Sequence, residues 1–65
     1  MKIRYFPETD TLLVNFSDRK IFETRDLNEN VLVELGEDGD IVSMTIEHAK
    51  RHVDVTEFSY QTAVS

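Results

Sequence analysis

Residues 31–46 read VLVELGEDGDIVSMTI, and this stretch decides the fold. Apolar residues stand at every second position on both sides of a central acidic run, and alternation at a period of two is typical of strands. The step Asp38-Gly39 lies between the two runs, and such a step is a strong hairpin signal because it suits a tight turn. The stretch therefore predicts two antiparallel strands, over about 31–36 and 40–46.

Two further strands are predicted upstream, over about 2–6 and 11–16. The first run stops at Pro7, which suits the second position of a type I turn, so we expect the chain to reverse there. Leu12, Val14 and Phe16 share one face of the second run. The polar residues 17–20, which read SDRK, are interpreted as the turn of another hairpin.

The third of the five predicted strands, over about 21–27, has polar side chains on both faces. That composition is typical of an edge strand or a heavily solvated one. All the connections are short, and sequential strands tend to be neighbours in space, so the simplest topology is a meander in the order 1-2-3-4-5.

The alternation ends after Glu47, and residues 48–52, which read HAKRH, predict a short helical turn. Asp54 and Glu57 have the spacing of a capping box, whereas Val53 and Val55 favour extended structure. The conformation of 53–65 stays open, and 60–65 is expected to be frayed. The predicted fold is α+β, mainly β: one domain over 1–65, an antiparallel β-meander of about five short strands with a short C-terminal helical segment.

The chain has 65 residues and no cysteine, so its core is small and disulfides are excluded. No apolar run resembles a signal peptide or reaches the roughly 20 residues of a membrane span, which favours a cytoplasmic protein. One face of the sheet must be covered, and the C-terminal segment is too short to cover five strands. A homo-oligomer, with a dimer favoured, is therefore predicted.

Thirteen acidic and seven basic side chains give a formal net charge of −6. This charge repels phosphate backbones, so we expect no direct binding of nucleic acid, and we expect none to membranes. A basic protein would instead be attracted. The alternative is that the charge only keeps a small sheet protein soluble.

No set of residues specifies a chemistry. There is no cysteine nucleophile, and two glycines are too few for a phosphate-binding loop. We predict no enzyme activity, no catalytic residue and no cofactor, and no partner-binding residue can be named. His48 and His52, with Glu47 beside them, are weak candidates for a metal site, because residues four apart share one face of a helix. Ala49 stands where the helical zinc motif has its catalytic glutamate, and two surface histidines are the alternative.

Several stretches carry a resemblance through their order along the chain: KIRYFPETD over 2–10, LLVNFSD over 12–18, and DGDIV over 38–42 leading to IEHA over 46–49. Together they resemble the domain of unknown function 2283 family, from Lys2 to about Phe58. Phe6 and Ser43 stand where members of that family typically have Asp and Gly. The resemblance implies a small β-rich prokaryotic protein. Some members lie beside genes for ribonuclease-type toxins, which implies an antitoxin role.

The leading hypothesis is a small acidic protein-binding module, the antitoxin-like partner of a basic ribonuclease-type toxin. Its C-terminal segment, 54–65, would become ordered on contact with the partner. One alternative is an oligomer that binds a metal or small ligand, with His48, His52 and Glu47 of two subunits converging at an interface. Another is a purely structural protein.

Overall fold

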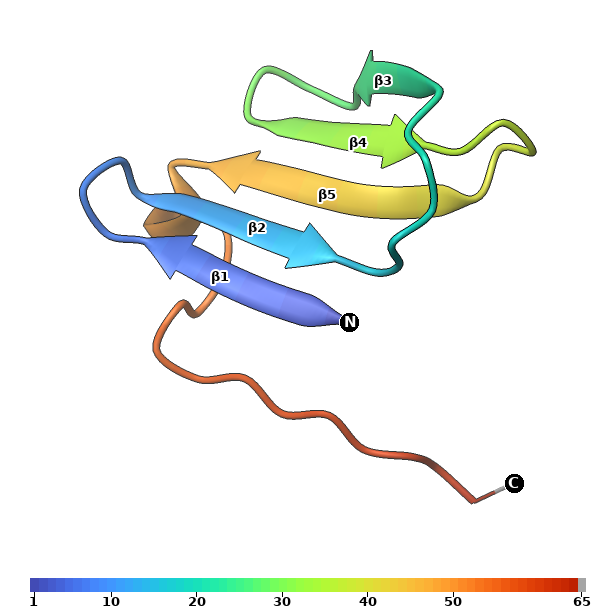
Figure 1. Cartoon of the computed structure of the whole chain (residues 1–65). Helices are drawn as coiled ribbons and strands as arrows, with labels where there is room; N and C mark the ends of the chain where they lie inside the picture. Colours follow the sequence, from blue (N-terminus) through green and yellow to red (C-terminus); the bar gives the residue numbers. More distant parts are fainter. Residues whose placement is uncertain (65) are drawn as a thin grey trace.

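The computed structural model of the protein describes residues 1–64. Its elements are β1 Lys2–Phe6, β2 Thr11–Asn15, β3 Glu23–Asp26, β4 Val31–Leu35, β5 Ile41–Glu47 and the 3-10 turn η1 Ala49–Arg51. The strands form a single antiparallel five-stranded sheet (Figure 1). The five predicted strands are confirmed, although β3 is shorter at both ends than the predicted 21–27.

The strand order is β1-β2-β5-β4-β3, so the predicted meander order 1-2-3-4-5 is wrong. A hairpin of β1 and β2 and a meander of β3, β4 and β5 are joined by the pairing of β2 with β5. β3 lies at an edge of the sheet, as its polar composition predicted. The pairing of β2 with β5 makes both of them interior strands.

The connection between β2 and β3 decides this order. The Phe16 backbone N–H donates to Val42 O at 2.8 Å, and the Phe22 N–H donates to Leu35 O at 2.8 Å. Residues 17–20 therefore do not form the predicted hairpin turn. They belong to a segment that crosses the ends of β5 and β4, in front of the sheet in Figure 1. Seven extended residues span up to about 23 Å, which exceeds the roughly 15 Å of three strand spacings.

Both hairpin turns predicted from turn residues are present. Asp10 closes the β1–β2 turn with a positive φ of 54°, a conformation that Asp tolerates better than most side chains. Gly39 has a φ of 87° in the β4–β5 turn, where the Gly36 N–H donates to Asp40 O at 2.8 Å. The step Asp38-Gly39 thus supplies the left-handed residue that this turn requires.

The short helix predicted over 48–52 is not confirmed, because within residues 1–64 this segment forms a helical turn of the 3-10 kind alone, η1. His48 precedes it with a φ of 53°, a left-handed conformation from which no right-handed helix continues backward. Asp54 makes a local turn by accepting a hydrogen bond from the Thr56 N–H at 3.0 Å, but no helix follows. Residues 60–64 have no regular structure, and Ser65 of the predicted frayed segment lies outside the described residues.

The two faces of the sheet differ in chemistry. Ile3 lies opposite Val14, and Val14 lies opposite Met44. The apolar face carries, on four strands, Ile3, Tyr5, Leu12, Val14, Val31, Val33, Leu35, Met44 and Ile46. The polar face carries Lys2, Arg4, Leu13, Asn15, Leu32, Glu34, Ser43 and Thr45. Alternation along each strand separates these two sets.

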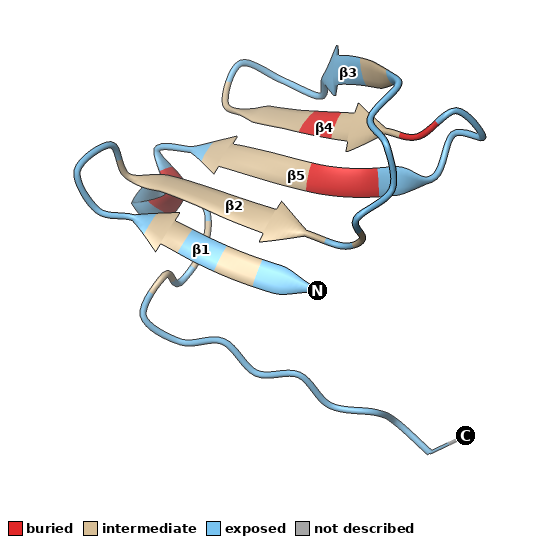
Figure 2. Cartoon of the chain, in the orientation of Figure 1, coloured by how far each residue is buried: buried red, intermediate tan, exposed pale blue. Residues whose placement is uncertain are grey.

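The core is very small. Its fully buried apolar side chains are Val33, Val42 and Ala49, with 5%, 1% and 0% of their surface exposed. Figure 2 shows burial confined to β4, β5, the turn between them and η1. The radius of gyration is 12.8 Å, whereas a compact chain of this length has about 10.7 Å. The molecule is one sheet layer with an extended C-terminal segment rather than two packed layers. No helix within residues 1–64 is long and apolar enough to cross a membrane.

Candidate functional site

Asp10 is the centre of a hydrogen-bonded cluster at one end of the sheet. Its Oδ1 accepts a hydrogen bond from the Tyr5 hydroxyl at 2.6 Å and another from the Lys50 backbone N–H at 3.2 Å. Its backbone oxygen accepts from the Ala49 N–H at 2.9 Å. These bonds join the β1–β2 turn to η1, so the cluster fixes the point where the C-terminal segment leaves the sheet.

The bond between Tyr5 and Asp10 moves the pKa values of the two groups apart. It lowers the pKa of Asp10 below 3.8, and a smaller lowering comes from Lys50 and His48 nearby. The same bond raises the pKa of Tyr5 above 10.0. At neutral pH the carboxyl is therefore ionised and the phenol protonated. A general acid or base works best with a pKa near the operating pH, so this pair is suited to holding structure rather than to catalysis.

His48 and His52, the metal candidates from the sequence, are not brought together on one helical face. His48 lies in the left-handed region, and its Nδ1 is 2.9 Å from Asn30 Oδ1. His52 ends η1, where its backbone N–H donates to Ala49 O at 3.0 Å. Glu47 is exposed at the end of β5. Within residues 1–64, no three side chains of His, Cys, Asp or Glu are grouped so that they could hold a metal ion.

A hydrogen-bonded pair with one buried member lies on the polar face, and the sequence analysis did not predict it. Ser43 is only 2% exposed, and its hydroxyl donates to Glu34 Oε1. The two residues are direct partners in the register of β4 and β5. The serine proton is thus committed to Glu34 and the side chain is shielded from solvent, so Ser43 is not an accessible nucleophile. The only available signal was cross-strand register, which a strand prediction does not provide.

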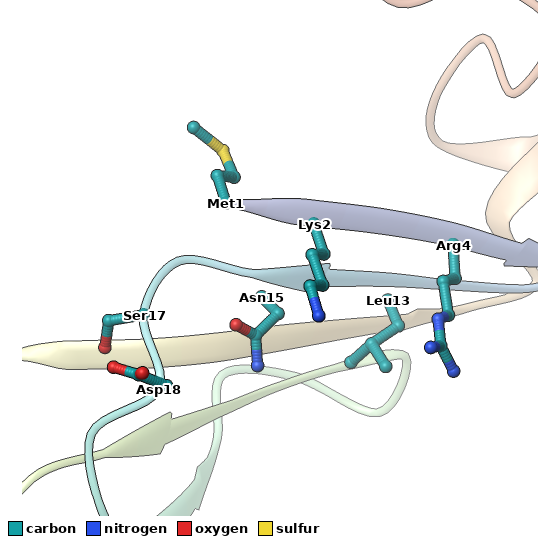
Figure 3. A pocket seen from close by; sticks show the side chains of 7 residues that line it. All are labelled: Met1, Lys2, Arg4, Leu13, Asn15, Ser17 and Asp18. Atoms are coloured by element: carbon teal, nitrogen blue, oxygen red, sulfur yellow. The ribbon is translucent and has the colours of Figure 1, made fainter.

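An open hollow of about 630 Å³ lies on the polar face at the β1 edge (Figure 3). It is lined by Met1, Lys2, Arg4, Leu13, Asn15, Ser17 and Asp18. Lys2, Arg4, Leu13 and Asn15 project to the same side of the sheet, whereas Met1 points away. Two basic side chains here face one acidic residue of the crossing segment. The hollow contains mixed charge and no activated group, so it does not define a reaction.

Most acidic side chains have no basic partner. Of thirteen Asp and Glu residues, only three form ion pairs within the described chain: Asp38 and Asp40 with Arg19, and Glu23 with Arg25. Ten are therefore left without one. Asp26, Glu29 and Glu47 surround a small hollow at the β3–β4 turn and the end of β5, and all three are exposed. We call these three residues the acidic corner.

A family model matches residues 2–50, about three quarters of the chain. The chain belongs to the family described as protein of unknown function (DUF2283). The DUF2283 match includes all five strands and ends within η1, although the resemblance was expected to reach about Phe58. The C-terminal segment beyond residue 51 thus lies outside it. No curated protein and no solved structure matches the chain at a significant level.

Proposed function

We propose that the chain is a small noncatalytic module that binds a basic protein through its acidic surface. The observation that carries this proposal is the set of ten carboxylates that lack a basic partner, three of which form the acidic corner. Exposed like charges in one place attract an oppositely charged surface and speed its association. The corner also offers the amides of Asn28 and Asn30, which can donate hydrogen bonds to a partner.

The specific form of the proposal is an antitoxin-like partner of a ribonuclease-type toxin. A ribonuclease must bind a phosphate backbone, so its substrate groove is basic. A compact acidic module seated on that groove would block RNA by occupying the same cationic side chains. The resemblance to a family with members beside such toxin genes supports this form of the proposal.

The test is calorimetric titration of the full-length chain with the protein encoded by the adjacent gene, at low and at moderate salt. We expect a defined stoichiometric complex that weakens as salt rises. If the partner cleaves RNA, stoichiometric addition of the chain should abolish cleavage. The absence of binding at both salt concentrations would contradict the proposal.

The acidic corner is tested by the triple variant Asp26→Asn, Glu29→Gln, Glu47→Gln. Its matched control is Glu8→Gln, Asp18→Asn, Glu57→Gln, which removes the same charge from exposed positions elsewhere. We expect the corner variant to raise Kd by about tenfold or more and the control by less than about threefold. Equal losses in the two variants would show that net charge, and not the corner, carries the binding.

A further inference from the structure

Within residues 1–64, nothing large enough to cover the apolar face packs on it. η1 and the C-terminal segment reach only the part of the face formed by β1 and β2, behind the sheet in Figure 1. Of the nine side chains that β1, β2, β4 and β5 place on this face, only Val33 is fully buried. A sheet with one apolar face is stable only when that face packs against another layer. The described part of the chain supplies no second layer for β4 and β5.

The exposed area is larger than a compact monomer should have. The chain exposes 5430 Å², whereas a folded monomer of its mass exposes about 4,300 Å². The excess of about 1,100 Å² exceeds the roughly 800 Å² that each partner buries in a standard interface. The extended C-terminal segment contributes to this excess, but it adjoins the same surface, because Phe58 and Tyr60 line a hollow with Ile3.

The charge on the apolar face points to a second copy as the occupant. None of its side chains on β1, β2, β4 and β5 carries a charge. The charged side chains that β3 adds are Glu23 and Arg25, which pair with each other at 2.7 Å. Two molecules of net charge −6 repel, so they associate best through a surface without charge. A basic partner, in contrast, would find there only the Glu23 carboxylate, which already pairs with Arg25.

We propose that two copies of the chain pack their apolar faces together about a twofold axis, forming a two-layer β-sandwich. A twofold interface uses the same patch on both subunits, and a neutral apolar patch is complementary to itself. Two sheets packed face to face lie about 10 Å apart, which allows the half-buried side chains of both faces to interdigitate. This inference goes beyond the proposed function and does not depend on it.

The C-terminal segment forms the border of this interface. Val55 and Phe58 lie with Ile3, Leu12, Val14 and Phe16 along an apolar groove between the segment and the sheet. Phe58 is 64% exposed, which is costly for a large apolar side chain in a lone molecule. In the dimer, each Phe58 packs against the partner at the edge of the two sheets. Asp54, also along the groove, has its carboxylate occupied by Thr56.

The experiment is sedimentation equilibrium of the full-length chain over a range of concentrations. We expect a mass of twice 7.6 kDa. Phe58→Ser should raise the dimer dissociation constant on the order of 30-fold, the effect of losing an aromatic anchor. The matched control is Phe22→Ser, which removes the same side chain from a position that is 71% exposed, before β3 and away from the apolar face. It should change the constant by less than about twofold.

Three results would overturn the proposal: a monomer at every concentration, a larger assembly than a dimer, or equal weakening by the Phe58 and Phe22 variants. Ile46→Asp adds a test at the centre of the face. A folded Ile46→Asp variant, verified by circular dichroism, should be monomeric, and a folded dimer would count against the interface. If that variant does not fold, the Phe58 and Phe22 pair still decides.

Discussion

The two faces of the sheet differ in how far the chain itself covers them. The polar face needs no covering layer: Ser43 donates to Glu34, the crossing segment passes over the end of β5, and no buried polar side-chain atom of residues 1–64 lacks a partner. On β1, β2, β4 and β5, the apolar face has no polar side chain apart from Tyr5, which bonds to Asp10, and on β3 Glu23 and Arg25 pair with each other. What it lacks is a covering layer. The polar face is therefore complete in one molecule, whereas the apolar face is complete only when something packs on it.

The largest effect should come from placing a charge at the most deeply buried position of β5. Val42→Asp puts a carboxylate where the side chain is 1% exposed, so an uncompensated charge is buried. We expect the free energy of unfolding to fall by about 3–5 kcal/mol, measured by urea denaturation. Ile41→Asp, at the neighbouring position, is the matched control. Ile41 is 48% exposed, so this variant should lower the free energy of unfolding by less than about 1 kcal/mol. Similar losses for both would erase the distinction between inside and outside on this strand.

A smaller effect should come from the hydrogen bond between Ser43 and Glu34 on the polar face. Ser43→Ala removes the hydrogen bond to Glu34 Oε1 and leaves one carboxylate oxygen without this donor. We expect a loss of about 1 kcal/mol in the same denaturation experiment. Thr45→Ala, at the next position of the polar face on β5, is the control for strand propensity. It should lower the free energy of unfolding by less than Ser43→Ala does. If Ser43→Ala were neutral, the polar face would not depend on this pair.

The bond between Tyr5 and Asp10 predicts a dependence of stability on acid. Because the pKa of Asp10 is below 3.8 in the folded chain, its ionised form stabilises the fold above that value. The contribution is lost as the pH falls through the lowered pKa. Tyr5→Phe removes the main cause of the shift, so its melting temperature should fall less steeply than that of the wild type between about pH 5 and pH 2.

The difference between the wild type and Tyr5→Phe is the informative quantity, since hydrogen bonds also lower the pKa values of Asp38 and Asp54 and give both proteins some acid dependence. Identical acid profiles would show that the Asp10 cluster does not hold the C-terminal segment. Hydrogen exchange at residues 49–58 gives a second measurement, which should quicken in Tyr5→Phe.

The smallest effect is expected at the exposed ion pairs between the crossing segment and the β4–β5 turn. Arg19 contacts Asp38 at 3.1 Å and also contacts Asp40, but these side chains are 57–62% exposed. Arg19→Gln should therefore lower the free energy of unfolding by less than about 1 kcal/mol, with no change at high salt. A larger loss would mean that the crossing segment depends on these contacts.

Much of the local structure could be predicted from sequence because it depends on neighbours along the chain. Period-two alternation located the strands, and Pro7 and the step Asp38-Gly39 located two turns. The polar composition of β3 predicted an edge strand or a heavily solvated one, and β3 lies at an edge, although the predicted meander would have placed it at the centre. The helix predicted at 48–52 is reduced to a 3-10 turn, because composition does not reveal that His48 is held in a left-handed conformation, where its ring contacts Asn30.

By itself, the sequence determined which residues are strands, where two hairpins turn and which side chains share a face, since all three follow from backbone geometry over a few residues. Only the tertiary structure decided that β5 lies between β2 and β4, because a short polar segment such as 17–20 serves equally as a turn or as a crossing. The same pairing of β2 with β5 joins the apolar sides of four strands into one continuous surface. That surface depends on strand order, so no reading of single strands reveals it.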